Sequence, residues 1–421
     1  MDRAPLREPE FAKLWWAMLI TRIGTGMVFV AVPFQIQELT DDPLAVGLLG
    51  AVGLIPTLAT GLLGGALADA IDRRTLILAG EGLFVVAAVA LYLNARSTSP
   101  QLWLIYVVAA THASGAGIQR PAAESIFKQV IRYEHVSAAA TLNSFRSSVS
   151  YLFGLLLGGI LITHFGVSGA FFVDALTCIP ALVLFAMLRT RRTTDGIHNP
   201  VFDSIRFGIS YARTRPELIG TYALDTVAMV FGLPVALLPA FSKQFGGAGA
   251  LSYLAAAPFL GSLLASASSR WTAKVHRHGR AIVFAAMLWG VGIMFMGLSR
   301  NLWLAVVCFA FAGAADMISG VFRMTIWNQT IPNELRGRLA GIELISYSAG
   351  PLLGDLESGV AARFISVRGA IVSGGVACSV GCAGLGRAMR QFWFYDDRTN
   401  PAATAERQRQ LGARVRAPDG V

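Results

Sequence analysis

The sequence has 421 residues, of which 54% are hydrophobic and only 14% are charged, and its mean hydropathy is +0.57. A soluble domain carries about 25% charged residues, so this composition excludes a chain of soluble domains and indicates a polytopic membrane protein. The net charge of +10 does not indicate a nucleic-acid partner, because the basic residues lie in short clusters between apolar segments rather than in one stripe or tail.

Apolar segments long enough to cross a bilayer follow one another along the chain. In the first part of the chain we expect helices at 11–38, 44–70, 75–94, 101–128, 137–164 and 169–189. In the second part we expect helices at 216–243, 250–272, 280–298, 302–329, 338–365 and 369–394. The sequence therefore predicts an all-α membrane protein with twelve transmembrane helices in two six-helix bundles.

The composition divides the chain into four parts. The N-terminal bundle covers 1–189 and the C-terminal bundle covers 216–394. The polar, basic segment 190–215 includes an amphipathic stretch, so we expect a cytoplasmic linker with a helix on the membrane surface. The last part, 395–421, is polar and charged and is expected to be a disordered cytoplasmic tail.

An internal repeat relates the two bundles at an offset of 200 residues, as from Gly154 to Gly354. Other identical pairs at this offset are Ile126 and Ile326, Gln129 and Gln329, Glu134 and Glu334, Gly159 and Gly359, and Gly169 and Gly369. Matches at one register across three consecutive segments indicate that the bundles arose by duplication.

Basic residues occupy every second connection between the predicted helices. These connections carry Arg73 and Arg74, Lys128 and Arg132, the arginines of 189–215, the basic residues of 270–280, Arg336 and Arg338, and the tail from Arg387. By the positive-inside rule these connections and both termini are cytoplasmic in a multi-pass protein of the cell membrane.

The sequence has no motif for a cofactor, a metal ion or catalysis. It contains no nucleotide-binding loop, no His-Glu-x-x-His pair and no nucleophile elbow. The four cysteines, Cys178, Cys308, Cys378 and Cys382, lie in apolar segments without the spacing of a zinc site or a disulfide framework. We therefore expect no cofactor, no metal site and no enzymatic activity.

A charged turn joins the second and third predicted helices, and residues 64–74 read GGALADAIDRR. This turn resembles the loop motif of the major facilitator superfamily, in which a glycine is followed four residues later by Asp and then by a basic pair. The gating candidates are Gly65, Asp69, Asp72, Arg73 and Arg74, although Ala70 and Asp72 depart from the usual residues.

The resemblance implies a major facilitator fold in which Asp69 approaches the start of the eleventh helix, near Arg338, and holds the cytoplasmic side closed. A carboxylate is favoured at a helix N-terminus by about 0.3–1 kcal/mol. The alternative is a simple charged turn at the membrane surface.

A narrower resemblance lies in residues 17–74. Val30–Gln37, Val46–Leu48, the turn at 64–69 and Arg22 are similar to the siderophore-exporting branch of the superfamily, which contains the enterobactin exporters. The resemblance implies secondary active, proton-coupled efflux of a siderophore or another amphiphilic small molecule by alternating access. Multidrug exporters share parts of this pattern, so a multidrug efflux pump is an alternative, as are a non-transporting membrane sensor and an uptake permease.

Ionisable residues inside the predicted helices are candidate functional residues, because a charge at the bilayer centre costs about 2.5–3.5 kcal/mol on insertion scales. The candidates for the cavity and for proton coupling are Arg22, Arg120, Arg146, Asp225, Asp316 and Arg323. Asp174 is also buried in its helix, whereas Glu81, Glu124 and Glu357 are nearer to helix ends and are expected to reach the interface.

Arg22, Asp225 and Asp316 are expected to lie deepest, in helices that line the central cavity of the superfamily. An acid beside an arginine can exchange its proton for the charge of its partner, so Asp225 or Asp316 is the expected proton carrier. A permanent structural ion pair is the alternative. The expected partners are a small-molecule substrate, protons and the lipid bilayer, and a monomer is expected.

Glycines mark two of the predicted helices. The fifth contains Gly154, Gly158 and Gly159, and the eleventh contains Gly350, Pro351 and Gly354. Small residues spaced by four let helices approach closely and a proline lets a helix bend, so these positions are hinge candidates where one bundle rocks against the other. Ordinary close packing is the alternative.

Overall fold

The computed structural model describes residues 3–189, 206 and 209–416, apart from the side chains of 62–70, 128, 133, 333–334, 336–338, 340–346 and 410–416. The N-terminal half contains α1 (Pro9–Thr40), α2 (Pro43–Ala70), α3 (Arg73–Arg96), α4 (Leu102–Val130) and α5 (Val136–Ala186). The C-terminal half contains α7 (Pro216–Gly232), α8 (Leu238–Ser242), α9 (Ala248–Ala267), α10 (His278–Leu298), α11 (Leu302–Thr330), α12 (Asn333–Phe364) and α13 (Val367–Ala388).

The helix bounds differ from those expected at two places. α5 is broken at Gly166, whose φ of 70° is a left-handed conformation that glycine adopts without strain, so its two arms, 136–165 and 167–186, are the expected fifth and sixth helices. The expected helix at 216–243 is interrupted instead. α7 ends at Gly232, and a short 3-10 turn, η3 (Val235–Leu237), follows Pro234, which has no backbone N–H to continue the helix.

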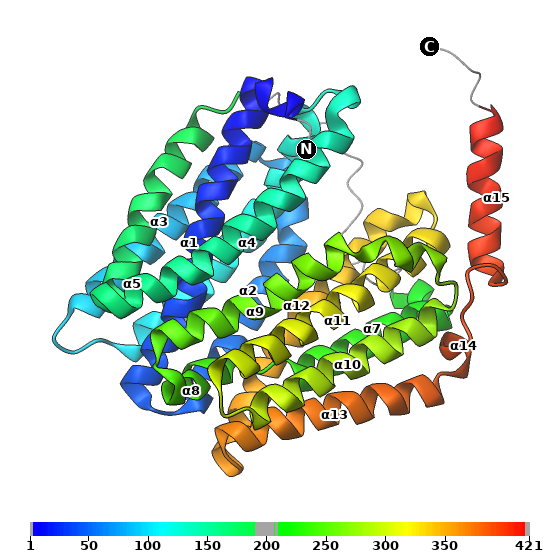
Figure 1. Cartoon of the computed structure of the whole chain (residues 1–421). Helices are drawn as coiled ribbons and strands as arrows, with labels where there is room; N and C mark the ends of the chain where they lie inside the picture. Colours follow the sequence, from blue (N-terminus) through cyan, green and yellow to red (C-terminus); the bar gives the residue numbers. More distant parts are fainter. Residues whose placement is uncertain (1–2, 190–205, 207–208, 417–421) are drawn as a thin grey trace.

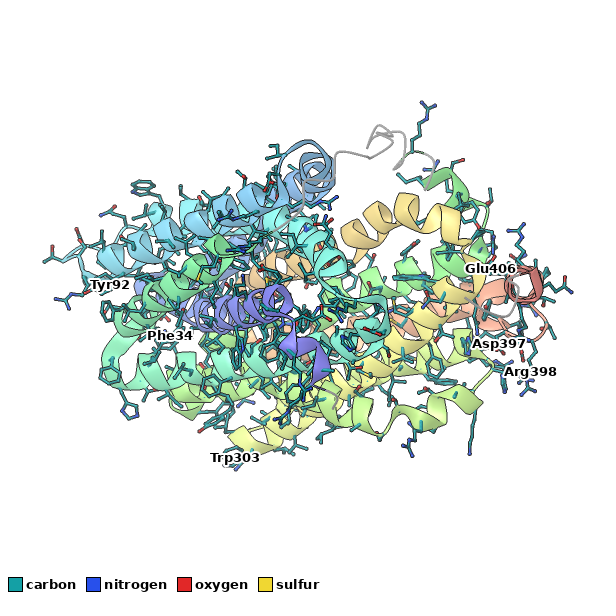
Figure 2. The ribbon with its side chains drawn as sticks, turned by 90° about the horizontal axis from the view of Figure 1, so that it is seen from above. Phe34, Tyr92, Trp303, Asp397, Arg398 and Glu406 are labelled. Atoms are coloured by element: carbon teal, nitrogen blue, oxygen red, sulfur yellow. The ribbon has the colours of Figure 1, made fainter. Side chains whose placement is uncertain are left out.

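Within the described residues, nine helices are long and apolar enough to cross a membrane, and the two-armed α5 is counted once among them. Large apolar side chains also cover the outer surface, such as Trp303 at the periphery of the view in Figure 2, which is 61% exposed, and Phe364, which is 82% exposed. In water such a surface would be unstable, whereas in a bilayer it faces lipid chains. The chain is an all-helical membrane protein of about twelve long helices.

The two halves lie close together at one end of the bundle and diverge toward the other (Figure 1). We call the diverging end, where α1 begins and α13 ends, the basic end, because its connections carry Arg73, Arg132, Arg213 and Lys274. The other end, where α1 ends and α13 begins, is called the opposite end. The main contacts between the halves are those of α2 with α12 and of α5 with α9.

The segment after residue 394 was expected to be disordered, but 401–416 form a helix, α15 (Pro401–Arg416), which packs against α11. The side chain of Asn400 accepts hydrogen bonds from the backbone N–H groups of Ala402 and Ala403, which caps the new helix. Asp397, just before it, pairs with His276 at 3.0 Å and with Arg407 at 3.6 Å (Figure 2). The expected linker helix falls mostly on 190–205 and 207–208, outside the described residues.

Candidate functional site

Two acidic residues and one arginine form a charge cluster in the C-terminal half, which we call the C-half triad. Nη1 of Arg323 in α11 forms an ion pair with Oδ1 of Asp225 in α7, and Nη2 of Arg323 lies 3.5 Å from Oδ1 of Asp316. Asp316 and Arg323 are seven residues apart on α11, which places them on the same helix face. The arginine beside the two acids is therefore Arg323, a partner that the sequence analysis did not assign.

The triad faces a cavity from one side only. The side chains of Asp225 and Arg323 are 9% and 14% exposed, whereas that of Asp316 is 37% exposed. Asp316 and Arg323 line a cavity of about 610 Å³ together with Ser262, Met317, Gly320, Val321, Met324, Thr325 and Asn328. Asp316 is therefore the triad member that a ligand in this cavity reaches most readily.

Three arginines gather in the N-terminal half, and we call them the N-half arginine cluster. They come from three helices, Arg22 from α1, Arg120 from α4 and Arg146 from α5. Arg22 lies within electrostatic range of both Arg120 and Arg146. Like charges at this separation repel, so the cluster is held together by the packing of its helices and creates a strongly positive region.

The described residues around these three arginines supply too few carboxylates to neutralise their positive charge. Nε of Arg120 lies 3.3 Å from Oε1 of Glu124, but both side chains are more than half exposed. Nε of Arg146 donates to Oδ1 of Asn143 at 3.0 Å, and its buried Nη1 has no hydrogen-bond partner among the described residues. Arg22 likewise forms no ion pair in the described part of the chain. The cluster is thus suited to an anionic group from outside the chain.

Aromatic rings lie beside the arginine cluster and reach the other half. Tyr151 of α5 lies near Arg22, and its ring centroid lies 5.8 Å from that of Phe29 and 4.9 Å from that of Phe259 in α9. Arg120 lies 5.5 Å over the ring of Tyr347 in α12. The positive cluster therefore faces the C-terminal half across an aromatic contact rather than facing lipid.

The halves are closed against each other at the opposite end. Nζ of Lys243, after α8, forms an ion pair of 2.5 Å with Oδ1 of Asp41 at the end of α1. Nearby, α2 lies so close to α12 that a Cβ at Gly50 would be 2.1 Å from the carbonyl oxygen of Leu352. The ion pair and this backbone contact join the two halves of the chain, so separation of the halves at this end must break both.

A cross-link at this ion pair should therefore stop any motion that opens the opposite end. We expect Asp41→Cys combined with Lys243→Cys to lose on oxidation the transport that the sequence predicts and to regain it on reduction, while each single variant stays insensitive to oxidant. Oxidation without any effect on flux in a fully cross-linked sample would contradict this expectation.

The same ion pair has a defined pH dependence. The hydrogen bond from Lys243 and its positive charge lower the pKa of Asp41 below its ordinary value. A carboxyl whose pKa is lowered in the folded state contributes stability above its unfolded pKa, and that contribution is lost as the pH falls through the lowered pKa. The closing contribution of this pair is therefore complete at neutral pH and is lost only in acid.

The charged turn between α2 and α3 has a structural role in the described residues. Asp72 caps α3 by accepting hydrogen bonds from the backbone N–H groups of Arg74 at 2.9 Å and Thr75 at 3.2 Å. The guanidinium of Arg74 donates to the carbonyl oxygen of Ala186, at the end of the second arm of α5. The side chains of Gly65, Asp69 and Arg338 lie outside the described residues, so the gating role of Asp69 stays a prediction, as does that of Arg73.

The marked glycines are sites of close helix approach. A Cβ at Gly154 would lie 2.3 Å from the carbonyl oxygen of Ile23 in α1, and a Cβ at Gly158 would lie 3.0 Å from Cα of Met27. Gly159 faces Ser252 of α9 in the other half, where a Cβ would lie 2.2 Å from the hydroxyl.

The eleventh expected helix, α12, repeats this arrangement. A Cβ at Gly354 would lie 2.5 Å from the carbonyl oxygen of Met229 in α7, and a Cβ at Gly350 would lie 2.9 Å from Cβ of the same residue. Pro351 lies inside α12 between them. The pairs α1 with α5 and α7 with α12 thus use glycines of the internal repeat in the same way.

Sequence analysis missed Glu81, which it placed at the membrane interface. Glu81 is fully buried, at 0% exposure, in the middle of the N-terminal half. It lies eight residues after the start of α3, which is about 12 Å along the helix axis and too deep for its carboxyl group to reach the interface. That distance along the helix was the signal that could have identified it.

The comparison with protein families decides to which group of proteins this chain belongs. The profile described as transmembrane secretion effector matches residues 2–399. The chain belongs to this family, a branch of the major facilitator superfamily. Membership makes it a secondary transporter rather than an enzyme, as expected.

Relatives include the enterobactin exporter EntS of Citrobacter koseri, 26% identical over 373 residues, and that of Shigella flexneri, 25% identical over 369 residues. Each alignment covers 87% of this chain and 88% of the relative. The predicted resemblance to the siderophore-exporting branch is confirmed at this level of similarity.

Solved structures with a similar fold include the nucleoside transporter NupG, with a TM-score of 0.73 at 11% identity, covering 92% of this chain and 99% of NupG. A POT family transporter in complex with 5-aminolevulinic acid has a TM-score of 0.73 at 12% identity, covering 91% and 96% of the two chains. A bacterial homologue of the human lysosomal transporter Spinster, in an inward-facing conformation, has a TM-score of 0.65 at 15% identity, covering 94% and 97%. These similarities confirm the predicted major facilitator fold.

Proposed function

We propose that this transporter exports an amphiphilic small molecule with acidic groups, a siderophore in the first place, in exchange for protons. The similarity to enterobactin exporters supports this choice of substrate class. The positive-inside rule makes the basic end cytoplasmic, and the halves diverge there and meet at the opposite end (Figure 1). In this arrangement the substrate enters from the cytoplasm and leaves when the opposite end opens.

The N-half arginine cluster is the observation that carries the proposal. Arg22 and Arg146 have no carboxylate partner among the described residues, so an acidic substrate can supply their counter-charge. Hydrogen bonds from a guanidinium to an anionic oxygen are about twice as strong as neutral ones. The rings of Tyr151 and Phe259, beside the cluster, offer an apolar contact to the aromatic or aliphatic part of the same molecule.

The C-half triad supplies a means of proton coupling. A proton taken up by Asp225 or Asp316 neutralises that carboxylate and weakens its attraction to Arg323. Arg323 is then free to interact with the substrate or with the facing half. Because Asp316 is the more exposed acid, we propose that it exchanges protons with the cavity and that Asp225 keeps Arg323 in place.

Flux measurements in inverted membrane vesicles test both parts. A labelled siderophore is followed under an imposed pH gradient for the parent, Arg22→Gln, Arg146→Gln and Asp316→Asn, with Arg300→Gln in an exposed connection as the control. We expect at least about a tenfold loss for the three cavity variants, the equivalent of 1.4 kcal/mol, and the parental rate for the control. Transport that is independent of the gradient, or unchanged in all three variants, would contradict the proposal.

A multidrug pump is the second candidate, because Asp316 shares its cavity with Met317 and Met324. A carboxylate among flexible, polarizable thioethers suits varied apolar cations. A fluorescent cationic dye measured in parallel separates the two candidates: efflux of the dye with no siderophore flux favours the multidrug pump. Accumulation of substrate in the direction of uptake would favour a permease.

A further inference from the structure

Two carboxyl groups lie inside the N-terminal half, away from the C-half triad. Glu81 of α3 is 0% exposed, and Asp174 of the second arm of α5 is 6% exposed. Both face α1, where Thr21 contacts Glu81 and Gly24 contacts Asp174. They lie within electrostatic range of each other, so two buried acids share one small region of the bundle.

Neutral groups donate hydrogen bonds to Glu81, and no cation among the described residues pairs with it. The hydroxyl of Thr21 donates to its two carboxyl oxygens at 3.0 and 3.2 Å, and Nε2 of Gln119 in α4 donates to Oε2 at 2.8 Å. No ion pair joins Glu81 or Asp174 to a basic residue in the described part of the chain. Arg22 follows Thr21 on α1, but it forms no ion pair with Glu81 or Asp174 among the described residues.

Asp174 is the unpartnered member of the pair. No described group donates a hydrogen bond to its carboxyl, which lies against the backbone of α1, where a Cβ at Gly24 would be 2.2 Å from Oδ1. The same side chain lines a mostly apolar cavity of about 210 Å³.

The other titratable groups around the pair form no ion pair with either carboxyl among the described residues. His112 of α4 and Asp355 of α12 line the same cavity as Asp174, and Cys178 lies one turn from Asp174 on its own helix. The ring of His112 is stacked on that of Phe84, with the ring centroids 4.5 Å apart. Among the described residues it forms no hydrogen bond or ion pair with a carboxyl group. The carboxyl of Asp355 accepts a hydrogen bond from the backbone N–H of Ala236 at 3.1 Å.

Electrostatics then dictates the state of the pair. Two carboxylates buried at close range without a cation repel each other, and an isolated buried charge is costly unless it is neutralised. The donors to Glu81 stabilise one ionised carboxylate. The second carboxyl, that of Asp174, has the lower free energy when it is protonated. We propose that Glu81 and Asp174 form a proton-binding site in the N-terminal half, separate from the C-half triad.

This site is connected to the arginine cluster through α1. Thr21, which holds Glu81, directly precedes Arg22, and Gly24, which contacts Asp174, follows it by two positions. When Asp174 loses or gains a proton, the charge beside Thr21 and Gly24 changes, while the charge of Arg22 on the same helix stays constant. The proposal rests on the proposed transport function and adds a second proton site to it. Because the proton is detected without any substrate, its test does not depend on transport.

Infrared difference spectroscopy of the purified protein in nanodiscs, recorded between acidic and alkaline pH, detects the proton directly. We expect the parent to show a protonated-carboxyl band that shifts in heavy water, disappears at alkaline pH and remains when Asp316→Asn removes the exposed acid of the C-half triad. Asp174→Asn should lose this band, whereas Glu81→Gln, which removes the neighbouring negative charge, should keep it and change the pH at which it disappears. Glu134→Gln, at an exposed carboxyl, should keep it. Gly24→Ala, which displaces the Asp174 carboxyl without removing it, should shift the band and so covers the case in which a charge variant does not fold.

Three results would overturn the site: no such band in the parent, a band that persists in Asp174→Asn, or a band removed at constant pH by sodium chloride but not by choline chloride. The last result would identify a sodium site. The test is separate from that of transport. If Asp174→Asn loses the band but the parent moves no siderophore, the proton site stands and the proposed substrate is rejected. If the parent shows gradient-driven flux but the band persists in Asp174→Asn, the proposed transport stands and the proton site is rejected.

Discussion

Arg323→Ala is expected to abolish transport and to lower the free energy of unfolding by about 3–5 kcal/mol, since removing one partner leaves a buried charge uncompensated. Asp225 is 9% exposed at its side chain and, among the described residues, its ion-pair partner is Arg323 across the contact between α7 and α11. The variant therefore affects both the packing of two helices and the triad that we propose for proton coupling. Thermal unfolding in detergent and vesicle flux measure the two effects separately.

A double variant separates stability from function at this site. Asp225→Asn combined with Arg323→Gln removes both charges and keeps the approximate shape, so most of the lost stability should return while transport stays absent. Arg300→Ala, in the exposed connection between α10 and α11, should change stability by no more than about 0.5 kcal/mol. If Arg323→Ala unfolds and transports like the parent, the triad has neither role.

Gly154→Val is expected to have the second largest effect, a loss of at least about 1–3 kcal/mol of stability with loss of transport. The added carbon would meet the carbonyl oxygen of Ile23 and Cα of Gly26. Both are backbone atoms of α1, so no side chain can move aside and the two helices must separate. The internal repeat predicts a similar effect for Gly354→Val, which meets the backbone of Met229 in α7.

Gly82→Ala is the matched control, because nothing lies within 4 Å of a Cβ built at Gly82 in α3. Alanine favours a helix over glycine by about 1 kcal/mol, so this variant should be neutral or slightly more stable. Thermal unfolding and flux should therefore distinguish a packed glycine from an open one. Equal behaviour of Gly154→Val and Gly82→Ala would show that close packing at Gly154 is unimportant.

The sequence by itself determined the class of the protein and most of its helices. A bilayer requires long apolar segments, so composition alone located spans such as 11–38 and 302–329, which the structure extends only to Pro9–Thr40 and Leu302–Thr330. The glycines of the repeat were also visible, because duplication preserves residues at a constant offset. Family membership agreed with motifs that need no tertiary information, such as the turn at 64–74.

Only the tertiary structure decided which charged residues are partners. Arg323 rather than Arg22 pairs with Asp225, because that choice depends on how α7 packs against α11, nearly one hundred residues further along the chain. Glu81 and Asp174 lie 93 positions apart and come together because α3 packs directly against α5. Hydropathy predicts which segments lie in the membrane, but it does not predict which neighbouring helix a given helix face contacts. That contact decides whether a charged side chain lies beside an opposite charge, beside a charge of the same sign, or in a cavity.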